Sequence, residues 1–129
     1  LLILATSLAY ATSVLIKNLV ERARPSAVDM ELPLKIDYSF PSGHTIGVAV
    51  VLLVLGYLIY SRAPTRKNLL SWGGVAIAGV ALVAFTRVYL GYHWITDVTA
   101  SVGLAFVILA LIISLDVLRH RSPGKKISL

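Results

Sequence analysis

The chain has 129 residues, of which 57% are apolar and only 14% are charged, and its mean hydropathy is +0.84. This composition argues against an ordinary soluble domain, and the absence of cysteine excludes disulfides and thiolate metal sites. The formal net charge of +6 raises the question of an anionic partner.

Four stretches lack Lys, Arg, Asp and Glu, namely residues 1–16, 38–61, 68–86 and 98–115. A helix of 18 residues is about 27 Å long, against a hydrocarbon core of about 30 Å. The sequence therefore predicts an all-α, polytopic transmembrane bundle, with a shorter first span. The alternative is that these stretches form buried helices of a larger soluble protein. However, the rest of the chain has too few polar residues to cover four such helices. We interpret residues 1–129 as a single membrane-embedded domain, and the start inside an apolar stretch suggests a fragment truncated at its N-terminus.

The first charged group after an apolar stretch is Lys17 with Arg24-Pro25. On a continuous helix, a spacing of seven residues places both cations on one face, where they could bind one anion, and Pro25 then ends the helix. The alternative is a pair of ordinary interfacial cations. Glu21 and Arg22 lie off this face, and we expect them to be solvated.

The second group is Pro41-Ser42-Gly43-His44, directly before the apolar residues 45–60. Pro, a small hydroxyl residue and Gly are typical of a helix start, where backbone N–H groups and the helix dipole attract anions. Ser42 adds a hydroxyl donor, and His44 would stand beside the bound anion. Alternatively, His44 is an interfacial residue without a chemical role.

The third group contains Arg87, His93 and Asp97. His93 and Asp97 are four residues apart at the start of the last apolar stretch, so the carboxylate can accept the imidazole N–H. This arrangement predicts an oriented nucleophile. The alternative is an Asp that stabilises a helix N-terminus.

A His and an Asp at this spacing could also bind a divalent metal ion. However, two like charges about 6 Å apart repel by roughly 2–3 kcal/mol at an effective dielectric constant near 20. A cluster of Lys17, Arg24 and Arg87 is therefore reasonable only around an anion, and we predict neither a metal ion nor a cofactor.

The basic residues also predict orientation. The segments after the second and fourth apolar stretches should be cytoplasmic because they carry Arg62, Arg66, Lys67, Arg119, Arg121, Lys125 and Lys126. The opposite face receives all three motif groups and has equal numbers of basic and acidic residues. The sequence therefore predicts one anion-binding pocket on the non-cytoplasmic face, and nucleic acid is not an expected partner. The cytoplasmic positive charge would attract anionic membrane lipids.

Lys17-x6-Arg24-Pro25, Pro41-Ser42-Gly43-His44 and Arg87-x5-His93-x3-Asp97 together resemble the signature of the type 2 phosphatidic acid phosphatase superfamily. Two departures are Thr86, where the family usually has Ser, and the presence of four spans where membrane members typically have six. The resemblance implies that Lys17, Arg24, Ser42, Gly43 and Arg87 bind phosphate. It further implies that His93 forms a phosphohistidine, that Asp97 orients it, and that His44 is the general acid and base.

The implied substrate is a lipid phosphate, such as phosphatidic acid, phosphatidylglycerol phosphate or a polyprenyl pyrophosphate such as undecaprenyl pyrophosphate. The sequence does not indicate how many copies of the chain associate. Residues 25–40 are long enough to gate the site, although a solvated loop explains their mixed charges better.

Two other functions stay open. The histidines and Asp97 could form the proton relay of a transporter that binds an anionic substrate, but relay residues are expected near the middle of a span. A purely structural bundle is the second alternative, in which small residues allow close helix packing, namely Gly73, Gly74, Ala76, Ala78, Gly79 and Ala84. This packing would not explain the cations.

Overall fold

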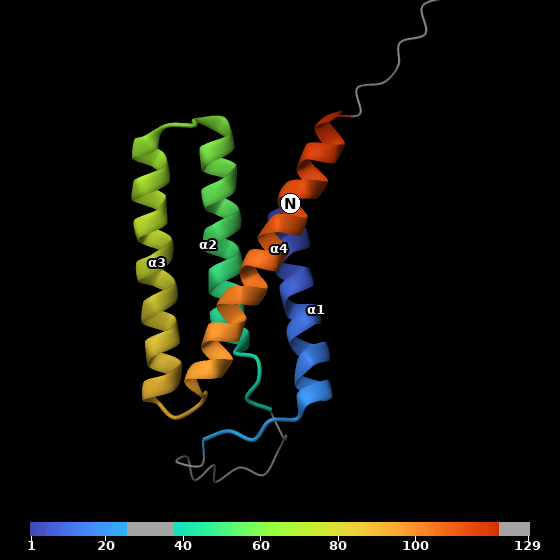
Figure 1. The fold of residues 1–129 in the computed structure, drawn as a ribbon, viewed down its shortest axis with the longest axis vertical. Coiled ribbons are helices and arrows are strands. Elements are labelled where there is room, and N and C mark those ends of the chain that lie inside the picture. Colours follow the sequence, from blue (N-terminus) through green and yellow to red (C-terminus); the bar gives the residue numbers. More distant parts are fainter. Residues whose placement is uncertain (26–37, 122–129) are drawn as a thin grey trace, which may run out of the picture.

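The computed structural model describes residues 1–25 and 38–121. Within these ranges it contains four α-helices, α1 (Leu2–Val20), α2 (Gly43–Arg62), α3 (Arg66–Tyr89) and α4 (Ile95–Arg121) (Figure 1). All four are long and apolar enough to cross a membrane. The predicted all-α transmembrane architecture is therefore confirmed. Several helix ends extend beyond the uncharged stretches and carry charged residues, as Arg62 and Arg87 do, whereas α2 begins inside its stretch, at Gly43.

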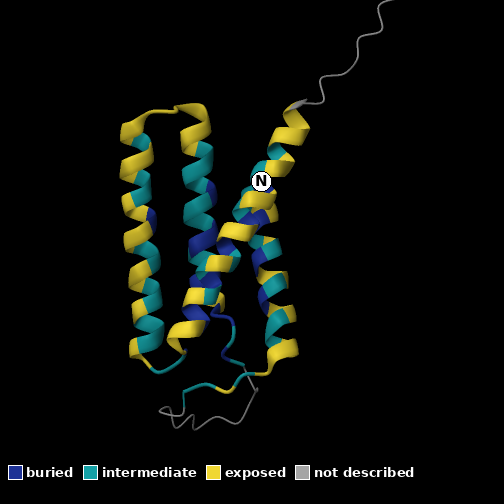
Figure 2. Ribbon diagram, viewed as in Figure 1, coloured by how far each residue is buried: buried dark blue, intermediate teal, exposed yellow. Residues whose placement is uncertain are grey.

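The core of the bundle lies between α1, α2 and α4. α2 is the central helix and contacts the other three, and α4 is inclined against it (Figure 1). The buried cluster is aliphatic, with small alanines on α1 facing larger side chains on α2 and α4, among them Ile46, Val50 and Ile112. Most of the outward surface is exposed and apolar, as expected for helices surrounded by lipid (Figure 2).

α3 packs on the outer side of α2, and a glycine makes this packing possible. The Trp72 indole N–H donates to the Leu52 carbonyl oxygen at 2.7 Å. A Cβ atom at Gly56 would lie 2.2 Å from Cδ1 of that indole, so only glycine fits there. Ala76 is buried against the bundle, and Gly79 lies close to Leu52. No atom of the described residues comes within 4 Å of a Cβ position at Gly73 or Gly74, so the structure shows no close packing at these two glycines.

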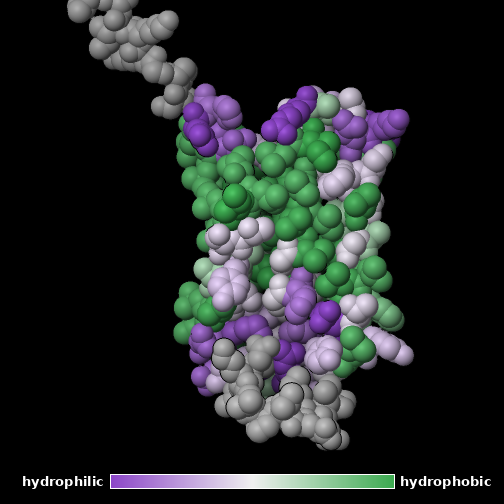
Figure 3. Space-filling view, turned by 180° about the vertical axis from the view of Figure 1, so that it is seen from behind, coloured by the Kyte–Doolittle hydropathy of each residue, from purple (hydrophilic) through white to green (hydrophobic). Residues whose placement is uncertain are grey.

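The two ends of the bundle are polar and the middle is apolar (Figure 3). α1 and α3 end, and α2 and α4 begin, at one end, and this end carries all three motif groups. Arg62, Arg66 and Lys67 lie at the opposite end. The possible gate within residues 25–40 and the basic residues Lys125 and Lys126 fall almost entirely on positions 26–37 and 122–129, which lie outside the described residues.

Candidate active site

A cavity of about 640 Å³ opens at the end of the bundle where the motif groups meet. Its lining includes Lys17, Arg24, His44, Arg87 and His93, which come from α1, α2, α3 and the two segments that connect helices at this end. Residues separated by up to two spans in the sequence thus surround one space. Gly43 also lines this cavity, whereas Ser42 and Asp97 lie behind it.

Lys17 and Arg24 both reach the cavity, but not from one helical face. α1 ends at Val20, and Glu21 follows in the left-handed conformation (φ 49°) with its N–H bonded to the Lys17 carbonyl. Arg24 therefore comes from a non-helical segment, and the expectation of a continuous helix ended by Pro25 is wrong. Lys17 Nζ donates to the Tyr38 carbonyl, and Arg24 Nη1 donates to the Tyr92 carbonyl at 2.8 Å.

The start of α2 follows the predicted pattern, with Ser42 as the N-cap residue. The fully buried Ser42 Oγ accepts from the Thr45 hydroxyl at 2.9 Å and more weakly from the Thr45 N–H at 3.4 Å. The Ser42 N–H donates to Ser101 Oγ at 2.9 Å, and this hydroxyl lies 2.7 Å from the Asp97 carbonyl. These bonds fix α2 to α4, so that Gly43 and His44 are the residues of this motif that border the cavity.

A tight turn after α3 carries His93. Gly91 adopts a positive φ of 70°, which favours glycine, and the N–H groups of Tyr92 and His93 both donate to the Arg87 carbonyl. The Tyr92 ring centroid lies 5.9 Å from the guanidinium carbon of Arg24 and equally far from that of Arg87. The turn therefore links the nucleophile candidate to both arginines of the cavity.

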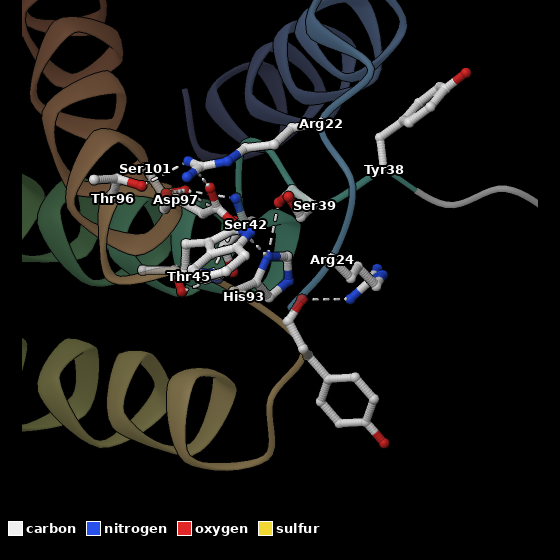
Figure 4. A network of polar contacts seen from close by, with 12 residues as sticks. Arg22, Arg24, Tyr38, Ser39, Ser42, Thr45, His93, Thr96, Asp97 and Ser101 are labelled. Atoms are coloured by element: carbon white, nitrogen blue, oxygen red, sulfur yellow. Dashed lines mark hydrogen bonds and ion pairs between the residues drawn. The ribbon is translucent and has the colours of Figure 1, made fainter. Parts of the chain in front are cut away.

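His93 is buried, and its nearest polar partner is not the one expected from the sequence. Its Nδ1 lies 2.7 Å from the Ser39 carbonyl oxygen and 3.5 Å from Asp97 Oδ2 (Figure 4). Because a carbonyl oxygen only accepts, Nδ1 carries the proton in this contact and Nε2 keeps its lone pair.

The charge state of His93 follows from its surroundings, in the turn outside the spans. Burial lowers the pKa of His93 below its ordinary value of 6.5; the Ser39 hydrogen bond opposes this shift, the Arg24 cation adds to it, and Asp97 opposes it. The net effect favours the neutral imidazole, which is the form that can act as a nucleophile.

Asp97 has two structural partners in addition to His93. It stands in the first turn of α4, where its Oδ2 accepts the Trp94 backbone N–H at 2.9 Å, as in one half of a capping box. Its Oδ1 accepts from Arg22 Nη1 at 2.8 Å. Asp97 therefore stabilises the N-terminus of α4, as the alternative interpretation expected, and it also contacts His93.

The expectation that Arg22 is a solvated residue is wrong, because it forms an ion pair with the fully buried Asp97. Ser39 and Ser101 also escaped the sequence analysis. Ser39 lies two residues before Pro41, and it contacts His93 through its backbone carbonyl. Because every residue type has such a carbonyl, the sequence contained no sign of this contact. Ser101 is four residues after Asp97, so a polar residue on the same face of an apolar helix was an available signal.

The cavity carries a clear excess of positive charge. None of the described residues that line it is acidic, and Arg87 Nε is buried without a hydrogen-bond partner among the described residues. A buried, unsatisfied donor is costly unless a ligand accepts its hydrogen bond. Three cations, two histidines and the amino-terminal end of α2 together suit a phosphate group.

The cavity is not confined to the polar end. It continues along α1 past Ser13 and Ala9 to Thr6, and on α2 it includes Ile46 and Gly47. This extension is mostly apolar and lies within the transmembrane part of the bundle. A polar compartment joined to an apolar groove fits a ligand with an anionic head and a hydrocarbon chain.

Comparison with known proteins agrees with this geometry. The family model described as "PAP2 superfamily" matches residues 1–121. The chain is 34% identical over 106 residues to phosphatidylglycerophosphatase B of Bacillus subtilis, an alignment that covers 78% of the chain and 49% of that relative. It is 30% identical over 118 residues to the decaprenylphosphoryl-5-phosphoribose phosphatase of Mycobacterium tuberculosis, covering 88% and 59%, respectively.

A solved structure shows the same helical arrangement. The crystal structure of a transmembrane PAP2 type phosphatidylglycerolphosphate phosphatase from Bacillus subtilis superposes with a TM-score of 0.77 at 28% identity, covering 89% of this chain and 57% of that one. The chain thus spans about half the length of the bacterial relatives described here.

Proposed function

The chain belongs to the PAP2 superfamily, and from this premise we propose that it hydrolyses a phosphate ester or pyrophosphate of a membrane lipid. The observation that carries the proposal is the cavity itself. It places Lys17, Arg24 and Arg87 beside two histidines, with no acidic residue among the described lining, and it continues into an apolar groove.

The three cations bind the phosphoryl oxygens and stabilise the additional negative charge that develops in the transition state. Gly43, at the first position of α2, lets the backbone approach the phosphate closely. The buried Arg87 Nε supplies a donor that has no other partner among the described residues. Ser42 builds the start of α2 and lies behind the cavity lining, and its hydroxyl, which accepts from Thr45, remains a proposed phosphate donor.

His93 Nε2 attacks phosphorus, and the bond between phosphorus and the leaving oxygen breaks while His44 donates a proton to that oxygen. The intermediate is a phosphohistidine. His44 then takes a proton from water, the water oxygen attacks phosphorus, and inorganic phosphate leaves with Nε2 restored. The Nδ1 proton stays on His93 throughout, held by Ser39 and Asp97.

The chemistry of the groove favours a lipid substrate over a soluble phosphate. The phosphate enters the cationic compartment, while the hydrocarbon chain lies between α1 and α2, beside Ala9, Ile46 and Gly47. The relatives named for phosphatidylglycerophosphate and for a decaprenyl phosphate support a diacylglycerol or polyprenyl carrier. We place the site on the non-cytoplasmic face because the basic residues Arg62, Arg66 and Lys67 lie at the other end.

Neither step of this mechanism requires a metal ion, since fixed cations already neutralise the phosphate. We therefore expect EDTA to leave the rate unchanged. A strong loss of activity that added Mg²⁺ restores would contradict the metal-independent mechanism.

The proposal is tested by phosphate release from a panel of lipid phosphates in detergent micelles. At least one of phosphatidic acid, phosphatidylglycerol phosphate and undecaprenyl pyrophosphate should be hydrolysed, and orthovanadate should compete with it as an analogue of five-coordinate phosphorus. His93→Gln should lower kcat by about a thousandfold or more without loss of the folded bundle. Binding of the lipids without turnover would instead favour the transporter, although the location of the site at the helix ends argues against it.

A further inference from the structure

Arg22 contacts the carboxylate that lies behind His93. It is absent from the residues that line the cavity, and its side chain points instead toward the start of α4 (Figure 4). Its Nη1 donates to Asp97 Oδ1 at 2.8 Å and to Thr96 Oγ1 at 2.6 Å. Its guanidinium carbon lies 5.4 Å from the centroid of the Trp94 ring.

The backbone of Arg22 makes a second connection to the same imidazole. The Ser39 N–H donates to the Arg22 carbonyl at 2.8 Å, and Ser39 Oγ donates to the Ala23 carbonyl at 3.1 Å. The carbonyl of Ser39 is the oxygen that lies 2.7 Å from His93 Nδ1. Arg22 therefore holds both acceptors next to Nδ1, the carboxylate through its side chain and the carbonyl through its main chain.

The ion pair also decides what Asp97 does. The Asp97 side chain is fully buried, whereas that of Arg22 is 35% exposed. A buried carboxylate without a cation would compete for the imidazole proton and stabilise an imidazolium. Paired with Arg22 and with the Trp94 N–H, it can orient the ring while leaving Nε2 unprotonated.

We infer that Arg22 is a positioning residue for the reaction, which fixes Asp97 and Ser39 so that His93 presents its Nε2 to the cavity. The inference rests on the proposed function only for its kinetic readout. Arg22 stands between Lys17 and Arg24 but contacts no part of the cavity, so its role differs from that of its two neighbours.

The first test compares Arg22→Gln and Arg22→Lys with a matched control, Arg62→Gln, an exposed arginine at the opposite end of the bundle. Arg22→Gln should lower kcat by about 10- to 100-fold, as is typical of residues that orient a reactive ligand, while KM changes by less than about twofold. Arg22→Lys should recover part of kcat, because an ammonium can pair with Asp97, and the control should match the wild type. A rise in KM with unchanged kcat, or no change at all, would overturn the inference.

A double-mutant cycle tests whether Arg22 acts through Asp97. In an Asp97→Asn background, Arg22→Gln should lower kcat by less than about threefold, because the ion pair between Arg22 and Asp97 is already lost. Fully multiplicative effects of the two substitutions would mean that Arg22 acts elsewhere.

The third readout does not need activity. The 15N chemical shifts of the imidazole should show that His93 is protonated at Nδ1, and its titration should move to higher pH in Arg22→Gln. The other described charged or titratable groups near this ring are not substituted in this variant, namely Lys17 on α1, His44 on α2, Arg87 on α3, Asp97 on α4, and Arg24 beside Arg22. Assignment uses His93→Gln, in which the signal disappears.

An unchanged His93 titration in Arg22→Gln would refute the positioning role. If the wild type instead hydrolyses no lipid phosphate while the tautomer and titration behave as expected, the proposed function fails and the placement of the imidazole by Arg22 stands.

Discussion

At the scale of single residues, the site depends on which proton each imidazole nitrogen carries. The Ser39 carbonyl makes the closest contact with His93, and a backbone oxygen cannot change its charge with pH. Asp97 contributes a second, longer contact at 3.5 Å. The tautomer of His93, the proposed nucleophile, is therefore fixed mainly by the fold of residues 39–42 and less by Asp97.

The pKa of His93 predicts the acidic limit of activity. Because burial lowers this pKa, the neutral Nε2 persists below pH 6.5, the ordinary value, and attack on phosphorus is lost only as the pH falls through the lower value. In a plot of kcat/KM against pH, the midpoint of the acidic limb should therefore lie below the ordinary histidine pKa. The plot should be measured with a substrate whose phosphate ionisation is known. A limb at or above the ordinary value would contradict a buried, neutral nucleophile.

At the scale of helices, α2 serves two purposes along its length. Its first turn borders the cationic part of the cavity, proposed to bind phosphate, and its next turn, with Ile46 and Gly47, borders the apolar groove. A Cβ atom at Gly47 would meet nothing within 4 Å, so the groove passes directly over this glycine.

Gly47→Leu should therefore narrow the groove, since its Cβ atom meets no neighbour within 4 Å. We expect KM for a long-chain lipid phosphate to rise by about tenfold, the equivalent of 1.4 kcal/mol, while turnover of a short, soluble phosphate ester stays within about twofold. Gly103→Leu is the matched control, because Gly103 on α4 also has open space around its Cβ direction but does not line the cavity. Equal effects on long and short substrates would indicate that the hydrocarbon chain lies elsewhere.

At the scale of the whole molecule, the alternation of spans brings distant residues to one end of the bundle. The proposed orientation can be tested with single cysteines, since the chain contains none. Ala63→Cys and Leu90→Cys introduce exposed thiols at opposite ends of the bundle. In intact cells, a membrane-impermeant maleimide should label Leu90→Cys and spare Ala63→Cys until the membrane is permeabilised. The reverse labelling pattern would place the site on the cytoplasmic face.

The sequence predicted the spans and the meeting of Lys17, Arg24, His44, Arg87 and His93 because hydropathy and topology carry that information. It could not predict where α1 ends, since the left-handed Glu21 is an unusual choice for a non-glycine residue. It also missed Arg22, because charge alone does not show whether an interfacial arginine faces water or a buried carboxylate. Contacts through main-chain oxygens, as at Ser39, leave no mark in the residue types.

α3 is attached to the bundle along one side only, and Ala76 is its sole buried residue, as the structure describes this helix in full. Its 24 residues measure about 36 Å, but the uncharged part, residues 68–86, is only about 28 Å long and so matches the roughly 30 Å hydrocarbon core. Arg87 lies in the last turn of this helix. Because Arg87 follows the uncharged stretch directly, the edge of the hydrocarbon core sets the depth at which this proposed phosphate ligand would meet the headgroup of a lipid.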